Sequence, residues 1–179
     1  MKRSELSHIL RAASKIADRD DVIVIGSQSI LGSYDEDDLP NRATLSREAD
    51  VTFWDDEDDF KSDAVDGALG EGSAFDQMYG YYAQGVSVST AILPEGWKDR
   101  MVPFRSSSAD PATGWCLEPH DLALSKLAAH REKDYEFVNA LLGAGLLAEA
   151  TLLERLPSMG IPTASRNRIQ RWIGFHAKN

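Results

Sequence analysis

The sequence has few of the features that mark secreted or membrane proteins. A single cysteine, Cys116, stands among 179 residues, so no internal disulfide can form, and no spacing of Cys and His matches a structural zinc site. No apolar run approaches the ~20 residues that span a bilayer, and the first residues lead into an amphipathic pattern rather than a signal-peptide core. We therefore expect a cytoplasmic protein without a membrane partner, in which Cys116 is a buried thiol.

Basic residues are also scarce, since 19 Lys and Arg stand against 29 Asp and Glu and give a net charge of −10. Such a surface repels phosphate backbones as a whole, which excludes broad nonspecific binding of nucleic acids. The acids gather in residues 35–38 and 55–59, and the bases of the last stretch are Arg155, Arg166, Arg168, Arg171 and Lys178. Both clusters are typical of solvated surfaces, although the basic one is the only candidate surface for RNA.

The first half of the chain carries alternating helix and strand patterns. Apolar residues at helical spacing predict a first helix with Ser4 as its N-cap and an end near Asp18. The run Val22-Ile23-Val24-Ile25 predicts a central strand buried on both faces, which stops at Gly26-Ser27 and feeds a short helix. An acid-rich loop is expected to follow as far as residue 44.

A second strand is predicted where polar and apolar residues alternate, from Ser46 to Trp54. One face would carry Ala49, Val51 and Phe53, and the other would carry Glu48, Asp50 and Thr52. A helix is then expected over residues 58–69, and strands over residues 81–93 and 101–105. Beyond residue 112 the apolar spacing is helical, so the order of elements predicts an α/β (α+β) core followed by helices.

Two of these segments have the chemistry of a metal and nucleotide site. Carboxylates one residue apart on a strand point the same way, so Glu48 and Asp50 can bind one or two hard cations. The turn at Gly26-Ser27 offers backbone N–H groups, a hydroxyl and the positive end of a helix to an anion such as a triphosphate. Each half alone is also common in ordinary structure, as a strand end or a solvated face, but their combination favours a metal–nucleotide site.

Three charged residues of the helical region fit such a site and also have structural interpretations. Lys126 lies among leucines, where its ammonium either extends to water or reaches an anion across a cleft. Arg131 needs a carboxylate or phosphate partner, and Asp134 at i+3 is one candidate. Asp134 is equally suited to cap a helix that begins at Tyr135.

Several segments resemble a known enzyme superfamily. Ile25-Gly26-Ser27-Gln28-Ser29-Ile30-Leu31 and Ser46-x-Glu48-Ala49-Asp50-Val51 resemble the hydrophobic-Gly-Ser and acid-x-acid motifs of the nucleotidyltransferases. Residues 120–134 resemble the lysine and Arg-x-x-Asp segment of the AbiEii-like branch, which includes toxins of bacterial toxin–antitoxin systems, and Leu93-Pro94-Glu95-Gly96-Trp97 with Arg100 fits that branch. The likeness covers most of residues 20 to 140, in order.

The resemblance implies a minimal nucleotidyltransferase fold, with a mixed sheet flanked by helices in residues 1–112 and a C-terminal helical subdomain in residues 113–179. It also implies metal-dependent transfer of a nucleoside monophosphate from an NTP to an acceptor hydroxyl, with Mg²⁺ or Mn²⁺ as cofactor. The acceptor would be RNA, such as tRNA, or a protein. Within a toxin–antitoxin system the chain would also have a cognate partner protein.

The resemblance assigns roles to residues by matching position. These roles are phosphate binding by Gly26 and Ser27, metal binding and activation of the acceptor by Glu48 and Asp50, neutralisation of phosphate charge by Lys126 and Arg131, and the acid of the last motif by Asp134.

One departure from the family pattern leaves a second interpretation open. Many members take a third carboxylate from a neighbouring strand, but residues 83–93 contain none and Glu95 is only a weak substitute. The alternative is a catalytically inactive binding or regulatory module, such as an antitoxin-type partner.

Overall fold

The chain folds around a five-stranded mixed sheet in the order β3-β2-β1-β5-β4. This computed structural model describes residues 1–176, so Lys178 of the basic segment lies outside the described residues. The strands are β1 (Asp21–Val24), β2 (Glu48–Thr52), β3 (Tyr82–Gly85), β4 (Val102–Phe104) and β5 (Thr113–Cys116). Strand β1 pairs antiparallel with β2 and parallel with β5, while β2–β3 is parallel and β4–β5 antiparallel.

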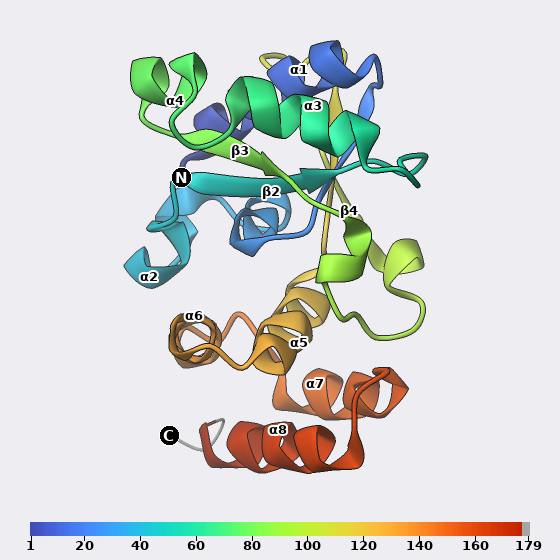
Figure 1. The fold of residues 1–179 in the computed structure, drawn as a ribbon. Helices are drawn as coiled ribbons and strands as arrows, with labels where there is room; N and C mark the ends of the chain where they lie inside the picture. The colour runs from blue at the N-terminus through green and yellow to red at the C-terminus, as the bar shows by residue number, and fades with distance from the viewer. Residues whose placement is uncertain (177–179) are drawn as a thin grey trace.

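Helices cover the sheet on both sides (Figure 1). They are α1 (Arg3–Ala17), α2 (Asn41–Thr44), α3 (Phe60–Leu69), α4 (Ala74–Tyr79), α5 (Pro119–Ala129), α6 (Glu132–Gly143), α7 (Glu149–Arg155) and α8 (Thr163–His176). In Figure 1, α1, α3 and α4 lie above the sheet, whereas α5 to α8 are stacked below it. The expected α+β fold, with a mixed sheet flanked by helices, is confirmed.

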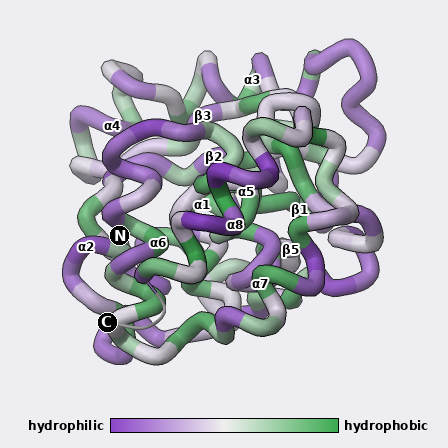
Figure 2. The backbone as a smooth tube through the Cα atoms, turned by 90° about the horizontal axis from the view of Figure 1, so that it is seen from below, coloured by the Kyte–Doolittle hydropathy of each residue, from purple (hydrophilic) through white to green (hydrophobic). Residues whose placement is uncertain are grey.

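The central position of β1 follows from its composition. Val22, Ile23 and Val24 have no exposed surface, as a strand flanked by two others and covered on both faces requires. In Figure 2 the tube is hydrophobic along β1, and the outer loops are hydrophilic. Cys116 on the neighbouring β5 is a buried free thiol, as expected, and burial raises its pKa to about 12.

Some local predictions were wrong where polar side chains compete for backbone groups. Helix α1 begins two residues earlier than expected, with Lys2 rather than Ser4 as N-cap, because the Glu5 carboxylate accepts from the Lys2 backbone N–H at 2.7 Å. The strand expected over residues 81–93 ends at Gly85, and the Ser87 hydroxyl then caps a 3₁₀ helix, Val88–Thr90. Helix α2 lies in a segment that was expected to be a loop, and no element was predicted for residues 74–79, which form α4.

Strand β5 was not predicted, because residues 113–116 fell in the segment expected to be helical. Its run is short and contains Gly114, which weakens the strand signal in the sequence. The glycine allows close packing against α1, since a Cβ there would lie 2.7 Å from Cδ1 of Leu10 and would require that side chain to shift. The boundary at residue 112 therefore does not separate sheet from helices, and the division into two units stays a prediction.

No helix within residues 1–176 is long and apolar enough to cross a membrane. The cytoplasmic location stays a prediction.

A buried ion-pair cluster fastens α7 to the rest of the protein. The Asp121 carboxylate on α5 has no exposed surface and accepts from Arg100 Nε and from Arg155 Nη1, each at 2.8 Å. Arg155 on α7 also pairs with Glu118, which caps the start of α5. A carboxylate with two guanidinium partners in the interior depends on all of them, because any charge left alone there is costly.

We expect Asp121→Ala to lower the free energy of unfolding by roughly 3–5 kcal/mol, because it leaves Arg100 and Arg155 without their buried partner. Urea unfolding at pH 7.5 measures this. Asp99→Ala, which removes an exposed carboxylate two residues after Trp97, serves as the matched control and should change stability by less than about 0.5 kcal/mol. Equal losses in the two variants would show that the cluster does not hold α7.

Candidate active site

The pairing of β1 with β2 brings the Gly-Ser turn to the carboxylates. Val24 lies opposite Val51, and the Ile25 backbone N–H donates to the Asp50 carbonyl at 3.1 Å. Gly26 therefore lies directly against the side chain of Asp50. A Cβ at Gly26 would lie 1.5 Å from Asp50 Oδ2, so only glycine allows the carboxylate to occupy this place.

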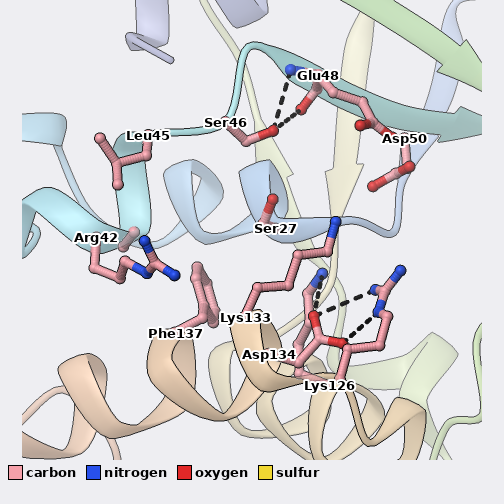
Figure 3. Close-up of a pocket in the computed structure, with 12 residues that line it drawn as sticks. Ser27, Arg42, Leu45, Ser46, Glu48, Asp50, Lys126, Lys133, Asp134 and Phe137 are labelled. Atoms are coloured by element: carbon pink, nitrogen blue, oxygen red, sulfur yellow. Dashed lines mark hydrogen bonds and ion pairs between the residues drawn. The ribbon is translucent and has the colours of Figure 1, made fainter.

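A cavity of about 310 Å³ opens beneath the carboxylates, between β2 and α2 on one side and α5 and α6 on the other (Figure 3). It is lined by six of the residues that the sequence predicted for the site, namely Ser27, Glu48, Asp50, Lys126, Arg131 and Asp134. Gly26 lines an adjoining cavity that shares both carboxylates. The structure thus brings together residues from three distant segments of the chain.

The two carboxylates are held close enough to influence each other. Burial raises the pKa of Asp50 to about 7, and a hydrogen bond with Glu48 and the like charge of Glu48 add to the rise. Tyr82 on β3 donates its hydroxyl to Glu48 Oε2 at 3.4 Å. Burial, followed by the charge of Glu48, raises the pKa of Tyr82 to about 12, so the phenol keeps its proton.

The opposite wall is cationic, and Asp134 organises it. This carboxylate is 2% exposed and pairs with Arg131 at 2.6 Å and with Lys126 at 3.4 Å. The charges of Lys126 and Arg131 reach Asp50, where they oppose the rise of its pKa. Asp134 is the third residue of α6, which begins at Glu132, so the predicted role as cap of a helix from Tyr135 was wrong.

Two further cations in the cavity were missed by the sequence analysis. Lys133 on α6 extends across the cavity toward Ser27 (Figure 3), and it forms no ion pair or hydrogen bond with any residue in 1–176. Arg42 on α2 lines the far end and pairs with Glu136 on α6. The sequence signal for Lys133 was the charge-rich run Arg131-Glu132-Lys133, whereas nothing near Arg42 pointed to it.

The helix after Gly26 contributes less than the sequence suggested. It is a 3₁₀ helix of six residues, Ser27–Gly32, and so short a helix has only a weak dipole. An anion in this cavity would therefore be held mainly by the cationic side chains.

The model of a protein family described as "Nucleotidyltransferase of unknown function (DUF6036)" matches residues 4–159 of the chain. The protein belongs to this nucleotidyltransferase family. No match was found among curated proteins, and none among solved structures. The matched residues include both the carboxylate strand and the cationic helices, so the resemblance to nucleotidyltransferases is confirmed at the level of the family.

Within residues 1–176, no third carboxylate lies on the strand next to Glu48 and Asp50. In the register of β2 with β3, Gln84 lies opposite Asp50. Glu95 lines a different groove, together with Pro157 and Gly160. Among the residues that the structure describes, no group of three or more His, Cys, Asp or Glu side chains is placed to hold a metal ion.

The two carboxylates nevertheless fit a hard divalent cation. Mg²⁺ and Mn²⁺ prefer oxygen ligands, and Mg²⁺ commonly takes one or two carboxylates with phosphate oxygens completing its shell. Burial, together with the hydrogen bond and the like charge of Glu48, raises the pKa of Asp50 to about 7, and a cation bound between the two carboxylates would relieve the repulsion between them.

We expect Gly26→Ala to weaken Mn²⁺ binding at least tenfold, because the added methyl group displaces the Asp50 carboxylate. Calorimetry at pH 8 measures the affinity, and circular dichroism checks the fold. Gly67→Ala is the matched control, since a Cβ at that position on α3 meets nothing within 4 Å. Wild-type affinity in Gly26→Ala would exclude the present position of Asp50 from the cation site.

The pKa of Asp50 also predicts how stability depends on pH. Between its ordinary value of 3.8 and about 7, the folded protein keeps a proton that the unfolded chain releases, so stability falls as pH rises through this window and then levels off. In metal-free buffer, Asp50→Asn should be more stable than wild type at pH 8, by on the order of 2–4 kcal/mol. Urea unfolding from pH 4 to 8 should show this gap shrinking toward pH 4, and a constant gap would contradict the assignment.

Proposed function

We propose that the protein is a metal-dependent nucleotidyltransferase that moves a nucleoside monophosphate from an NTP to an acceptor hydroxyl. The observation that carries this proposal is one cavity in which Glu48 and Asp50 face Lys126, Arg131 and Lys133. The carboxylates are suited to bind a metal ion, and the cationic side chains are suited to bind phosphates. Because the two groups face each other across a single cavity, together they match a metal-bound triphosphate.

The reaction forms one bond and breaks one. The acceptor oxygen attacks the α-phosphorus of the NTP, the bond from that phosphorus to the oxygen bridging to the β-phosphate breaks, and pyrophosphate leaves. The hydroxyl proton passes to the Glu48–Asp50 pair, which acts as the general base. Lys126, Arg131 and Lys133 stabilise the charge that develops on the pyrophosphate.

Mg²⁺ or Mn²⁺ held by Glu48 and Asp50 would neutralise phosphate charge and orient the α-phosphate toward the acceptor. Asp134 acts through Lys126 and Arg131. It keeps these two side chains in place, so it is a positioning residue for the phosphate-binding cations.

Among acceptors, we favour a protein hydroxyl over RNA. An RNA surface would need free cations at the C-terminal end, but Arg155 is consumed by Glu118 and Asp121. Arg166 donates to the Met159 carbonyl at 3.2 Å, and Arg171 to the Asn167 carbonyl at 3.3 Å. Arg155 is therefore not available to RNA, whereas Arg166, Arg168 and Arg171 have no carboxylate partner within residues 1–176. The net charge of −10 repels RNA from the protein as a whole.

We also propose that the protein belongs to the AbiEii-like branch and acts as a toxin with a cognate partner protein. Support comes from the segment 120–134, whose Lys126, Arg131 and Asp134 meet in the cavity. A neighbouring gene for a small DNA-binding regulator would strengthen this assignment, and an isolated gene would weaken it.

The test of the function is transfer of label from each α-³²P-labelled NTP, with Mn²⁺, to total cell protein or RNA. We expect one class of acceptor to be labelled by wild type, Asp50→Ala to lose at least 100-fold of the rate, and Lys133→Ala to lose roughly tenfold. Asp58→Ala, an exposed carboxylate beyond β2, is the control and should retain full activity. NTP binding without transfer would instead assign the protein as a regulatory binding module, which the place of Gln84 beside Asp50 would then explain.

A further inference from the structure

The carboxylate pair lies between two lobes of one cleft. The cationic lobe is the 310 Å³ cavity that contains Ser27, Arg42 and Lys133. The neutral lobe has a volume of about 250 Å³ and is lined by Gly26, Gln84, Val86, Thr90, Ala91, Ile92 and Ser125, among others. Both lobes share Glu48, Asp50, Lys126 and Arg131.

The two lobes differ in charge. The cationic lobe adds three charged side chains to the shared residues, namely Arg42, Lys133 and Asp134. Arg42 pairs with Glu136, and Asp134 pairs with Lys126 and Arg131. Lys133 has no partner among residues 1–176, so it is the unpaired charge of this lobe. The neutral lobe adds no charged side chain at all. An anion that extends away from the carboxylates is therefore stabilised in one direction only.

We propose that a bound NTP lies across the carboxylate pair with its β- and γ-phosphates in the cationic lobe and its nucleoside in the neutral lobe. This inference rests on the proposed function and gives the direction in which the substrate lies. It makes Gln84 and Ser125 the residues that recognise the nucleoside.

The neutral lobe offers the groups that a nucleoside needs. Gln84 presents an amide with both donors and an acceptor, and it lies opposite Asp50 on the adjacent strand. Neither the Gln84 amide nor the Ser125 hydroxyl has a hydrogen-bond partner within the described chain, so both are available to a base edge or a ribose hydroxyl. Ile92, which is 43% exposed, adds apolar surface at the rim for a flat ring.

The reverse orientation would place the nucleoside against Leu45 and Phe137 in the cationic lobe. Phe137 is 5% exposed, and the Lys126 ammonium lies 5.9 Å from the centre of its ring, so little of that ring is open to a base. Lys133 would then face an uncharged nucleoside, while the pyrophosphate would lie where only the shared cations reach it. The charges of the cleft oppose this arrangement.

Inorganic tripolyphosphate measures phosphate binding apart from nucleoside binding, because it has the phosphates of an NTP and no nucleoside. Calorimetry with Mn²⁺ and no acceptor gives its affinity and that of each of the four ribonucleoside triphosphates. We expect Gln84→Ala to weaken the preferred NTP three- to tenfold, and Ser125→Met, which fills the neutral lobe, to weaken it at least tenfold. Neither variant should change tripolyphosphate binding by more than twofold.

Two variants of the cationic lobe complete the design. Lys133→Ala should weaken tripolyphosphate and NTP by the same factor, at least fivefold, because it removes a phosphate contact that both ligands make. Leu45→Ala removes a side chain that is 64% exposed in the same lobe, and it should leave both ligands unaffected.

The outcomes distinguish this inference from the proposed function. NTP binding that is weakened by Leu45→Ala and insensitive to Ser125→Met and Gln84→Ala overturns the inference while the proposed function stands. A wild-type protein that binds tripolyphosphate but gains no affinity from any nucleoside also overturns it. Absence of binding for every NTP would overturn the proposed function itself.

Discussion

The antiparallel register of β1 with β2 is the constraint on which the site depends. It sets Gly26 against Asp50 so closely that no side chain fits between them, and the bond from Ile25 N–H to the Asp50 carbonyl fixes this position. A shift by one residue would turn Glu48 and Asp50 into the core and their apolar neighbours into the cleft. Because β1 is buried on both faces and β2 carries its apolar residues on one face, the hydrophobic core itself enforces the register.

The second half of the site comes from helices α5 and α6, which lie outside the sheet. Asp134 is buried between Lys126 on α5 and Arg131 at the start of α6, and it holds both cations at the edge of the cavity. A carboxylate wall and a cationic wall therefore face one another without touching. Direct contact would cancel their charges, but separation leaves each able to bind the opposite charge of a metal-bound phosphate. The ion pairs around Asp121 attach α7, on the far side of α5, to Arg100 and Glu118.

Family membership and geometry address different questions about this chain. The match over residues 4–159 places it among nucleotidyltransferases, whereas the roles of individual residues come from where the fold puts them. Gln84 illustrates the difference. Its place opposite Asp50 leaves the pair without a third carboxylate and gives the adjoining lobe an uncharged hydrogen-bonding group. Two carboxylates bind a cation more weakly than three, so in the proposed reaction the phosphates of the NTP would supply more of the metal's ligands.

The sequence by itself determined the features that arise from local patterns. The buried run before Gly26-Ser27 and the alternation around Glu48 and Asp50 specified two strands and their faces, because periodicity and turn chemistry act over a few residues. Strand β5 was not predicted, because its run is short and Gly114 weakens the strand signal. The close packing that this glycine allows is with Leu10, more than 100 residues away. Likewise, Arg42 and Lys133 belong to the site only because α2 packs near α6, and the two lobes exist only between elements that meet in three dimensions. Tertiary structure decided these features, since contacts between distant segments leave no period in the chain.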